Sequence, residues 1–240
     1  PVLHADVRSL YPSVMLTYNL SPPSDELDLF LGLLRSLRDF RLAARRAMVE
    51  AGSERERRYL GALQSTFKIL INSFYGYLGS GFAHWADTGR ANEVTGRGRE
   101  IVKAMLEWLE THGAQPIEVD TDGVYFVPPP GIDDDEAGAE AFVGELSAAL
   151  PEGIEVELGG RYRAMLSYKM KNYALLDYSG KLLITGSGLR SRGLERFQRE
   201  FLHEMIRLAL AGRRDEIPEL YQTMLDRFAR HEVHVREFMK

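Results

Sequence analysis

Two long segments with helical spacing of apolar residues, separated by a three-residue break, constrain this chain more than any other feature. Between residues 26 and 50 leucines recur at three- and four-residue steps, and Ala51-Gly52-Ser53 ends that pattern. A second helical segment follows over residues 54–74. The two segments predict an antiparallel αα-hairpin. Five arginines fall within an arc of roughly 140° on its first helix: Arg35, Arg38, Arg41, Arg45 and Arg46.

The rest of the chain alternates short β-rich runs with helical segments. The β-rich runs are 2–7, 117–120, 123–127, 155–158, 162–168, 173–178 and 181–185. The further helices are expected at 93–111, 137–150, 196–211 and 217–228. Thr121-Asp122 joins two of the runs as a hairpin. This order predicts an α+β fold with helical insertions.

Composition excludes several classes of protein. The 240 residues are 45% hydrophobic, enough for one large domain or two small ones. No run of 18 apolar residues occurs, which excludes a membrane span, and no signal peptide is visible. The absence of cysteine fits a cytoplasmic protein. Because the chain begins inside an apolar run, we expect it to be a piece of a longer protein.

Charge is unevenly distributed along the sequence. The net charge of −5 argues against a generally basic nucleic-acid binder, but clustered arginines permit local basic surfaces. Three aspartates stand where expected strands end: Asp6 after the first strand, and Asp120 and Asp122 around the hairpin tip. Residues i and i+2 of an extended segment share a face. Grouped carboxylates are costly without a divalent cation, and two magnesium ions serve phosphoryl transfer. On these residues alone, an ordinary turn and hairpin explain the pattern equally well.

Three sequence blocks, in the right order, resemble the motifs of family B DNA polymerases of the archaeal and bacterial type. DVRSLYPSVMLTYNLSP (6–22) resembles motif A, KILINSFYG (68–76) resembles motif B, and VDTDGVYF (119–126) resembles motif C. A fourth block, YKMKNYALLD (168–177), resembles the KxY motif. The resemblance covers about residues 1–201. Gly123 departs from the serine that is commonest in motif C, although some archaeal-type members also have glycine there.

The resemblance implies an architecture for the α+β fold. Residues 1–24 and 77–190 would form the palm, an antiparallel sheet with helices on one face. Residues 25–76 would form the fingers, an αα-hairpin insertion. Residues 191–240 would form a partial helical thumb. The proofreading exonuclease domain and most of the thumb would be missing.

The resemblance also implies a metal site. Asp6 and Asp122 match the aspartates that bind two catalytic metal ions, and Val7 supplies a backbone carbonyl. Asp120 matches a supporting carboxylate. The cofactor would be two Mg²⁺ ions, with Mn²⁺ able to substitute. Together with Lys68 these aspartates form the expected catalytic set.

Eight residues match nucleotide-binding positions of the family, three in motif A and five in the fingers: Ser9, Leu10, Tyr11, Arg41, Arg45, Lys68, Asn72 and Tyr75. The amides of the first three form a triphosphate cradle, and Tyr11 excludes a 2′-hydroxyl from beneath the incoming sugar. Lys68 binds the triphosphate. Arg41 is the expected first fingers cation because it lies 27 residues before Lys68, as in archaeal-type relatives.

The other fingers positions follow from helical spacing and from the same motif. Arg45 lies one turn beyond Arg41, and Arg38 is the fallback for Arg41. Asn72 and Tyr75 share a helical face with Lys68. Asn72 is expected to brace the site, and Tyr75 to pack under the nascent base pair.

Contacts with DNA are expected from Lys171, Tyr173 and Arg192. Alternation along a strand would place Lys171 and Tyr173 on one face. Glu155 and Glu157 form another i, i+2 pair. Either one of them is an extra carboxylate near the metal ions, or both lie on an ordinary solvent-facing strand.

The function implied is template-directed DNA synthesis from deoxynucleoside triphosphates on a primer–template, by a nucleoid-associated monomer with no membrane partner. The chain alone is expected to be weakly active. The alternative is a catalytically silent polymerase-like module that binds DNA or scaffolds a complex, but such a module would have lost carboxylates that this chain keeps. Reverse transcriptases and primases lack SLYPS and KxxxNSxYG. A metal-dependent hydrolase would leave Lys68 and the arginine-rich hairpin unexplained.

Overall fold

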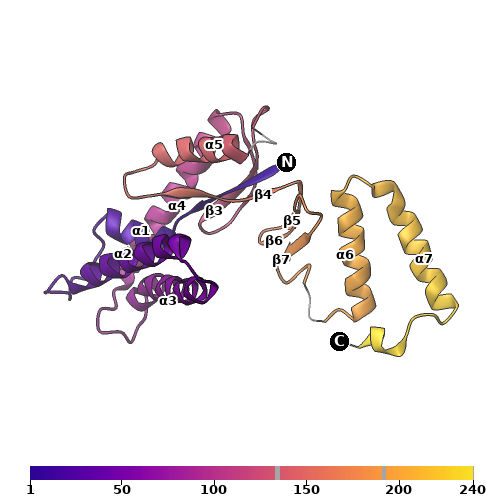
Figure 1. The fold of residues 1–240 in the computed structure, drawn as a ribbon, viewed down its shortest axis with the longest axis horizontal. Coiled ribbons are helices and arrows are strands. Elements are labelled where there is room, and N and C mark those ends of the chain that lie inside the picture. The colour runs from indigo at the N-terminus through magenta and orange to yellow at the C-terminus, as the bar shows by residue number, and fades with distance from the viewer. Residues whose placement is uncertain (133–135, 191–192, 240) are drawn as a thin grey trace. The chain divides into compact units, whose positions relative to one another are not determined.

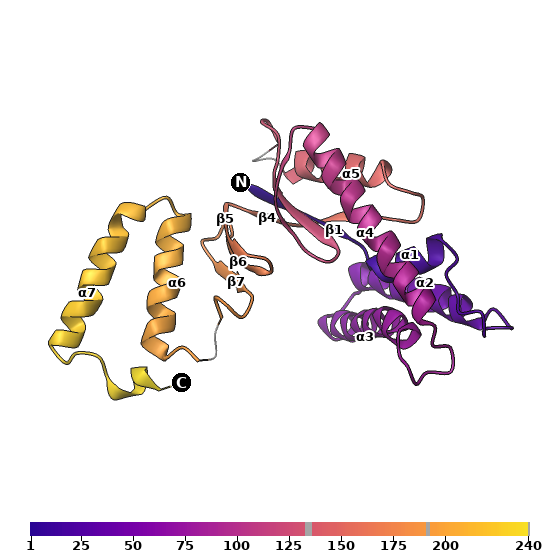
Figure 2. The same ribbon diagram turned by 180° about the vertical axis from the view of Figure 1, so that it is seen from behind.

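The computed structural model describes residues 1–132, 136–190 and 193–239, in two compact units (Figures 1 and 2). The sheet unit comprises Pro1–Asp6, Leu109–Phe142 and Leu158–Lys240, and the helical unit comprises Val7–Trp108 and Val143–Glu157. Helices and antiparallel strands are both present, which confirms the expected α+β class. Among the described residues, no helix has the length and apolar character needed to span a membrane.

The expected elements occur in the expected order, and one helix, α1 at Leu10–Thr17, was not predicted. The strands are β1 Val2–Val7, β2 Gln115–Val119, β3 Gly123–Val127, β4 Val156–Tyr162, β5 Ala164–Lys169, β6 Asn172–Leu176 and β7 Leu182–Thr185. The α-helices are α1 Leu10–Thr17, α2 Leu29–Glu50, α3 Glu54–Leu78, α4 Thr88–Thr111, α5 Glu136–Ala148, α6 Arg196–Leu210 and α7 Ile217–Ala229. Two short 3₁₀ turns lie at Arg214–Glu216 and Val235–Phe238. The largest shifts are in α4, which begins at Thr88 rather than 93, and α3, which continues past Gly76.

Helices α2 and α3 of the helical unit form the expected hairpin and lie side by side (Figures 1 and 2). The Asp25 carboxylate accepts hydrogen bonds from the amides of Leu29 and Phe30, at 3.0 and 2.7 Å, so α2 begins there rather than at residue 26. At the start of α3, Ser53 Oγ accepts a hydrogen bond from the Glu56 amide at 3.2 Å. These caps satisfy donors that a helix cannot satisfy itself and fix where each helix begins.

Aromatic packing holds the base of the hairpin together. Phe30 of α2 is almost fully buried and lies 5.0 Å from Phe74 and 5.9 Å from Trp85 between ring centroids. Farther along, Phe40 and Phe67 stack at 5.9 Å. Aromatic pairs at these separations add stability beyond their buried area, so the two helices are fixed against each other at two levels.

The first sheet has the strand order β2-β3-β1-β4. Strand β3 is its buried centre, and β1 pairs with β3 in an antiparallel register that runs from Leu3 opposite Phe126 to Asp6 opposite Gly123. Because a register shift of one residue would turn every side chain to the other face, the buried residues of both strands hold this alignment. The register is what positions Asp6.

The second sheet has the order β5-β6-β7, and α6 packs on it through Ala174, Leu189 and Ile206. Helices α6 and α7 lie beside each other (Figures 1 and 2), with Phe197 and Phe228 in edge-to-face contact at 5.0 Å. A second buried cluster joins the two sheets within the sheet unit: Val2, Tyr125, Tyr173 and Leu175. The β5–β6 hairpin is therefore tied to the first sheet.

Candidate active site

The antiparallel pairing of β1 and β3 brings the motif A and motif C carboxylates to one end of the sheet. Asp6 lies opposite Gly123, the residue that follows Asp122. Directly paired Cα atoms in such a ladder are about 4.5–5.5 Å apart. The Asp120 amide donates to the Gly123 carbonyl at 2.8 Å, which closes the hairpin turn. Segments far apart in sequence therefore bring Asp6 opposite the turn that Asp120 and Asp122 flank, and buried Val7 follows Asp6 as the last residue of β1.

Asp120 is engaged by a cation of the protein itself. Its carboxylate is 2.9 Å from Lys171 Nζ and accepts a hydrogen bond from the Thr121 amide at 2.7 Å. Burial tends to raise the pKa of Asp120, but these hydrogen bonds outweigh it and lower the pKa below its usual value. The Lys171 amide also donates to Glu118 at 2.8 Å, so this residue connects the hairpin tip to the β5–β6 turn.

The expectation that Lys171 and Tyr173 share one strand face is wrong. Lys171 lies in the turn before β6, with a left-handed φ of 58°. Tyr173 is 5% exposed, and its hydroxyl is 3.2 Å from that of Tyr125. Lys171 instead faces the motif C hairpin, while Tyr173 is part of the cluster between the sheets. Their contacts with DNA stay a prediction, and Arg192 lies outside the described residues.

The residues at the hairpin end suit a divalent cation only in part. Within residues 1–132, 136–190 and 193–239, no three or more His, Cys, Asp or Glu side chains are grouped so as to hold a metal ion. Asp6 and Asp122 nevertheless offer hard oxygen donors at neighbouring positions. Magnesium is often bound by one or two carboxylates, with water and substrate phosphates completing its shell, and this donor pair fits such a site.

His4 explains the departure at Gly123. Its ring stacks on Tyr125, with centroids 4.0 Å apart and planes 8° apart. A Cβ at Gly123 would lie 2.5 Å from His4 Nε2 and 2.8 Å from the Ala5 carbonyl, and a Cβ at Gly159 would lie 2.5 Å from His4 Nδ1. The imidazole therefore fills the space beside two glycines on the neighbouring strands. This role of His4 was not apparent from the sequence.

In the helical unit, motif A forms a tight turn followed by a helix. Ser9 adopts a left-handed conformation, with φ 51° and ψ 60°, at the N-cap of α1. The amides in the first turn of a helix have no acceptor within the helix and attract anions. Leu10 and Tyr11 provide such amides, whereas Pro12 has none. The backbone of Ser9–Tyr11 thus has the helix N-terminal geometry that attracts anions.

Arg41 of α2 reaches this turn. Its Nη1 lies 3.4 Å from Ser9 Oγ, and its buried Nε has no hydrogen-bond partner among the described residues. Burial lowers the pKa of Arg41, and the nearby Arg45 and Arg8 lower it further against an opposing effect of Glu157. A guanidinium among other cations is suited to bind an anion.

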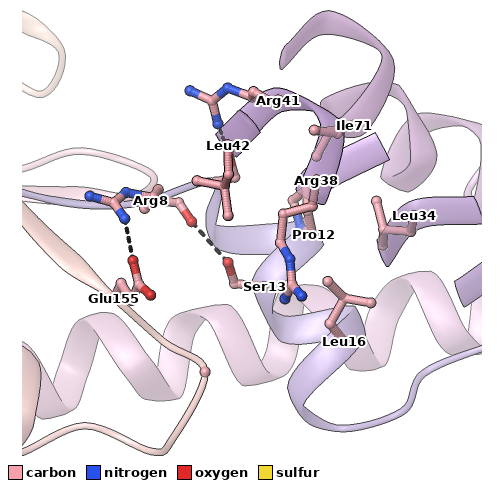
Figure 3. Close-up of a pocket in the computed structure, with 12 residues that line it drawn as sticks. Arg8, Pro12, Ser13, Leu16, Leu34, Arg38, Arg41, Leu42, Ile71 and Glu155 are labelled. Carbon is pink, nitrogen blue, oxygen red and sulfur yellow. Dashed lines mark hydrogen bonds and ion pairs between the residues drawn. The ribbon is translucent and has the colours of Figure 1, made fainter. Parts of the chain in front are cut away.

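Arg38 has a different environment. It lines the same cavity of about 260 Å³ as Arg41 but pairs with Asp39 at 3.3 Å. Figure 3 shows the two guanidinium groups directed to different sides, with Arg38 toward Leu16. Arg41, and not Arg38, is therefore the arginine in hydrogen-bond contact with the Ser9 turn.

Arg8 is a residue that the sequence reading missed. It forms ion pairs with Glu155 and, at 2.9 Å, with Glu157, and its carbonyl accepts a hydrogen bond from Ser13 at 2.8 Å (Figure 3). Glu157 also lies 4.0 Å from Arg45. The two glutamates therefore serve as partners of arginines. The signal available in the sequence was the opposite charge of Arg8 and the two glutamates. Opposite charge alone does not identify ion-pair partners that are so far apart in the chain.

The motif B residues occupy α3. Lys68 and Asn72 are exposed, while Tyr75 is partly buried, with its ring centroid 4.4 Å from that of Tyr11. Motifs A and B therefore meet through two tyrosines. Arg45 lies on α2, one turn beyond Arg41, as expected.

Comparisons with known proteins show which family this chain resembles. The family model described as DNA polymerase family B matches residues 28–239. DNA polymerase 1 of Pyrococcus abyssi is 29% identical over 256 residues, and a DNA polymerase of Pyrococcus glycovorans is 30% identical over 253. These alignments cover 97% and 95% of this chain but 33% and 32% of the relatives, so the chain spans about a third of their length.

A solved structure shows the same fold. The family B DNA polymerase from the archaeon Pyrobaculum calidifontis superposes with a TM-score of 0.76 at 23% identity, over 98% of this chain and 33% of that one. With the family model matching most of the sequence, the motif resemblance is confirmed: this chain belongs to DNA polymerase family B.

Proposed function

We propose that this chain carries out template-directed DNA synthesis, adding deoxynucleotides to a primer 3′ end by two-metal phosphoryl transfer. The observation that supports the proposal is the pairing of Asp6 with Gly123, the residue that follows Asp122 in the chain. In this assignment the first sheet belongs to the palm, the α2–α3 hairpin to the fingers, and α6 and α7 to a partial thumb.

The carboxylates would hold the metal ions. Asp6 and Asp122 are the proposed ligands, with the Val7 carbonyl. Two Mg²⁺ ions, when bound, would supply activation of the 3′-hydroxyl and charge neutralisation on the departing pyrophosphate. Asp120, paired with Lys171, shapes the hairpin tip.

The cationic residues would bind the triphosphate. The first-turn amides of α1 and the Arg41 guanidinium bind its oxygens as hydrogen-bond donors, since charge-assisted bonds to phosphate are the strong ones. Arg45 adds positive charge from the next turn of α2. Lys68 neutralises the triphosphate and donates a proton to the leaving pyrophosphate.

The remaining residues would set selectivity and hold the nucleic acid. Tyr11 rejects a ribose by steric contact with the 2′-hydroxyl, Tyr75 packs under the nascent base pair, and Asn72 braces the site. Lys171, Tyr173 and Arg192 are assigned to the primer–template. All of these residues belong to one chain, so the proposal needs no second copy.

Primer extension by the purified 240-residue chain with Mg²⁺ tests the proposal. DNA affinity falls with salt, and each phosphate contact adds about 0.9 to the slope of log affinity against log salt. A net charge of −5 adds no long-range attraction to DNA. We therefore expect weak, distributive synthesis that is measurable at low salt. Asp122→Ala should abolish it, a loss of at least about a thousandfold, because metal ligation supplies several kcal/mol.

The matched control is Glu145→Ala, which removes an exposed carboxylate from α5. It should extend primers as the unchanged protein does. If the unchanged chain binds primer–template but extends no primer with either Mg²⁺ or Mn²⁺, the silent DNA-binding alternative is the correct one.

A further inference from the structure

The Tyr11 ring is held by contacts from two helices. Its centroid lies 4.4 Å from that of Tyr75 on α3, with the ring planes 39° apart. A Cβ built on Gly98 of α4 would lie 3.2 Å from Tyr11 Cε1 and 3.6 Å from Cδ1. Carbon atoms in contact prefer about 3.5–4.0 Å. The backbone of α4 thus approaches one edge of the ring so closely that only glycine leaves it undisturbed.

Helix propensity does not explain a glycine at position 98. Glycine weakens a helix interior relative to alanine, and Gly98 lies well inside α4. A Cβ at Gly98 would also lie 3.4 Å from Leu10 Cδ2. The missing side chain is therefore explained by the close approach of motif A to this point of α4.

Gly96 provides an internal comparison. It lies two residues earlier in the same helix, and a Cβ there would meet only Arg99 Nη2, at 3.9 Å. An alanine at Gly96 would make an ordinary contact with the mobile end of a side chain. The two glycines have the same helix propensity, and they differ in whether Tyr11 is the neighbour.

We propose that Gly98 and Tyr75 are positioning residues that set the place of the Tyr11 ring and thereby determine how strongly the site discriminates deoxyribose from ribose. This inference rests on the proposed function, in which Tyr11 is the residue that meets the sugar. The sugar can only lie on a side of the ring that neither α4 nor Tyr75 occupies. In this assignment, a side chain at Gly98 pushes the Tyr11 ring away from α4 and toward the sugar. Loss of the Tyr75 ring allows the Tyr11 ring to move away from the sugar.

Single-nucleotide insertion kinetics at low salt test this, with kcat/KM measured for a deoxynucleotide and for the matching ribonucleotide. Gly98→Ala should increase the preference for deoxyribose by about two- to tenfold, with a higher KM, because displacing a packed side chain from its rotamer by a small angle has an effect of that size. Gly96→Ala should leave both substrates unchanged. Alanine favours the helix at both positions, so both variants should keep the helical circular dichroism signal.

Two further variants make the result decisive. Tyr75→Leu should lower the preference for deoxyribose by about two- to tenfold, the opposite direction, since the ring loses its second support. In a Tyr11→Ala background, Gly98→Ala should have no effect on the preference. An effect that persists there would overturn the inference.

Failure of this inference can be told apart from failure of the proposed function. If Tyr11→Ala relaxes the preference but neither Gly98→Ala nor Tyr75→Leu changes it, the positioning role is wrong and the role of Tyr11 stands. If Tyr11→Ala itself leaves the preference unchanged in an active enzyme, Tyr11 does not meet the sugar, and both assignments are wrong.

Discussion

The carboxylate end of the first sheet and the cationic turn of the helical unit handle their charges in different ways. At the hairpin end, Asp120 is already paired with Lys171 at 2.9 Å, and His4 fills the space beside Gly123 and Gly159. At the cationic turn, Arg41 lies near Arg45 and Arg8, with its Nε buried and without a hydrogen-bond partner among the described residues. Asp120 thus already has a charged partner within the protein, whereas the Arg41 guanidinium keeps a donor that a bound anion would satisfy.

This difference has a physical consequence for substitutions. A buried group that lacks its partner gains the most from a ligand, because its desolvation has already taken place. Substitutions at the cationic turn should therefore act on nucleotide affinity. Substitutions around His4 should act on folding stability.

The largest expected effect in this comparison separates Arg41 from Arg38. Arg41→Ala should raise the KM for the incoming nucleotide by about ten- to a hundredfold, since hydrogen bonds to charged groups are worth roughly 1.5–3 kcal/mol. Arg38→Ala, which removes a neighbouring guanidinium paired with Asp39, should change it less than about threefold. Steady-state primer extension over a range of nucleotide concentrations measures both. The reverse order would return the role to Arg38.

A smaller effect should appear in folding stability around His4. Gly159→Ala should lower the free energy of unfolding by about 1–3 kcal/mol, as overpacking does. In a His4→Ala background the same substitution should be nearly neutral, because the atoms nearest to a Cβ at Gly159 belong to His4. Urea unfolding of the four proteins gives the coupling energy.

The control for this cycle is Gly144→Ala in α5, where an added Cβ meets nothing within 4 Å. It should not destabilise the protein in either background. Strictly additive effects of the substitutions at His4 and Gly159 would show that the imidazole does not require the glycine.

The smallest expected effect concerns Lys171. Lys171→Ala removes the strongest hydrogen bond that lowers the pKa of Asp120, so this pKa should rise toward its usual value in a carboxylate NMR titration. A carboxyl group with a lowered pKa stabilises the fold above its unfolded-state pKa, and this contribution is lost as the pH falls through the folded-state value.

The stability difference between Lys171→Ala and the unchanged protein should therefore be present at neutral pH and disappear in acid. It should stay below about 1 kcal/mol, since more than half of the Lys171 side chain is exposed. Lys103→Ala, which removes a pair with Glu107 on α4, should leave the Asp120 titration unchanged. An unchanged titration in Lys171→Ala would contradict the proposed pairing.

Local patterns in the sequence predicted much of the fold. The spacing of apolar residues predicted the α2–α3 hairpin, and Ala51-Gly52-Ser53 marked its turn correctly. The alternating runs around Thr121-Asp122 predicted the β2–β3 hairpin. The resemblance implied that Asp6 and Asp122 act together, and in the structure Asp6 pairs with Gly123, the residue after Asp122. Each of these signals depends on residues close together in the chain or on a resemblance that includes them.

What the sequence could not reveal depends on contacts between distant segments. Lys171 was expected on a strand, but Met170 and Lys171 form a turn in which the Asn172 side chain donates to the Met170 carbonyl at 3.0 Å. The close contacts of His4 with Gly159, and of Tyr11 with Gly98, depend on how side chains pack in the folded protein. The spacing of apolar residues carries no information on such contacts.

The contact of His4 with two glycines also constrains the order in which this chain can change over evolution. A side chain at position 159 is tolerated only after His4 has become smaller, and at position 123 the backbone of Ala5 must shift as well. Substitutions at these three positions are therefore epistatic. Single changes that enlarge position 159 before His4 has become smaller are not tolerated. Relatives with serine at the position of Gly123 should have a smaller residue in place of His4. Sequences that combine a bulky residue at both positions should be missing from the family.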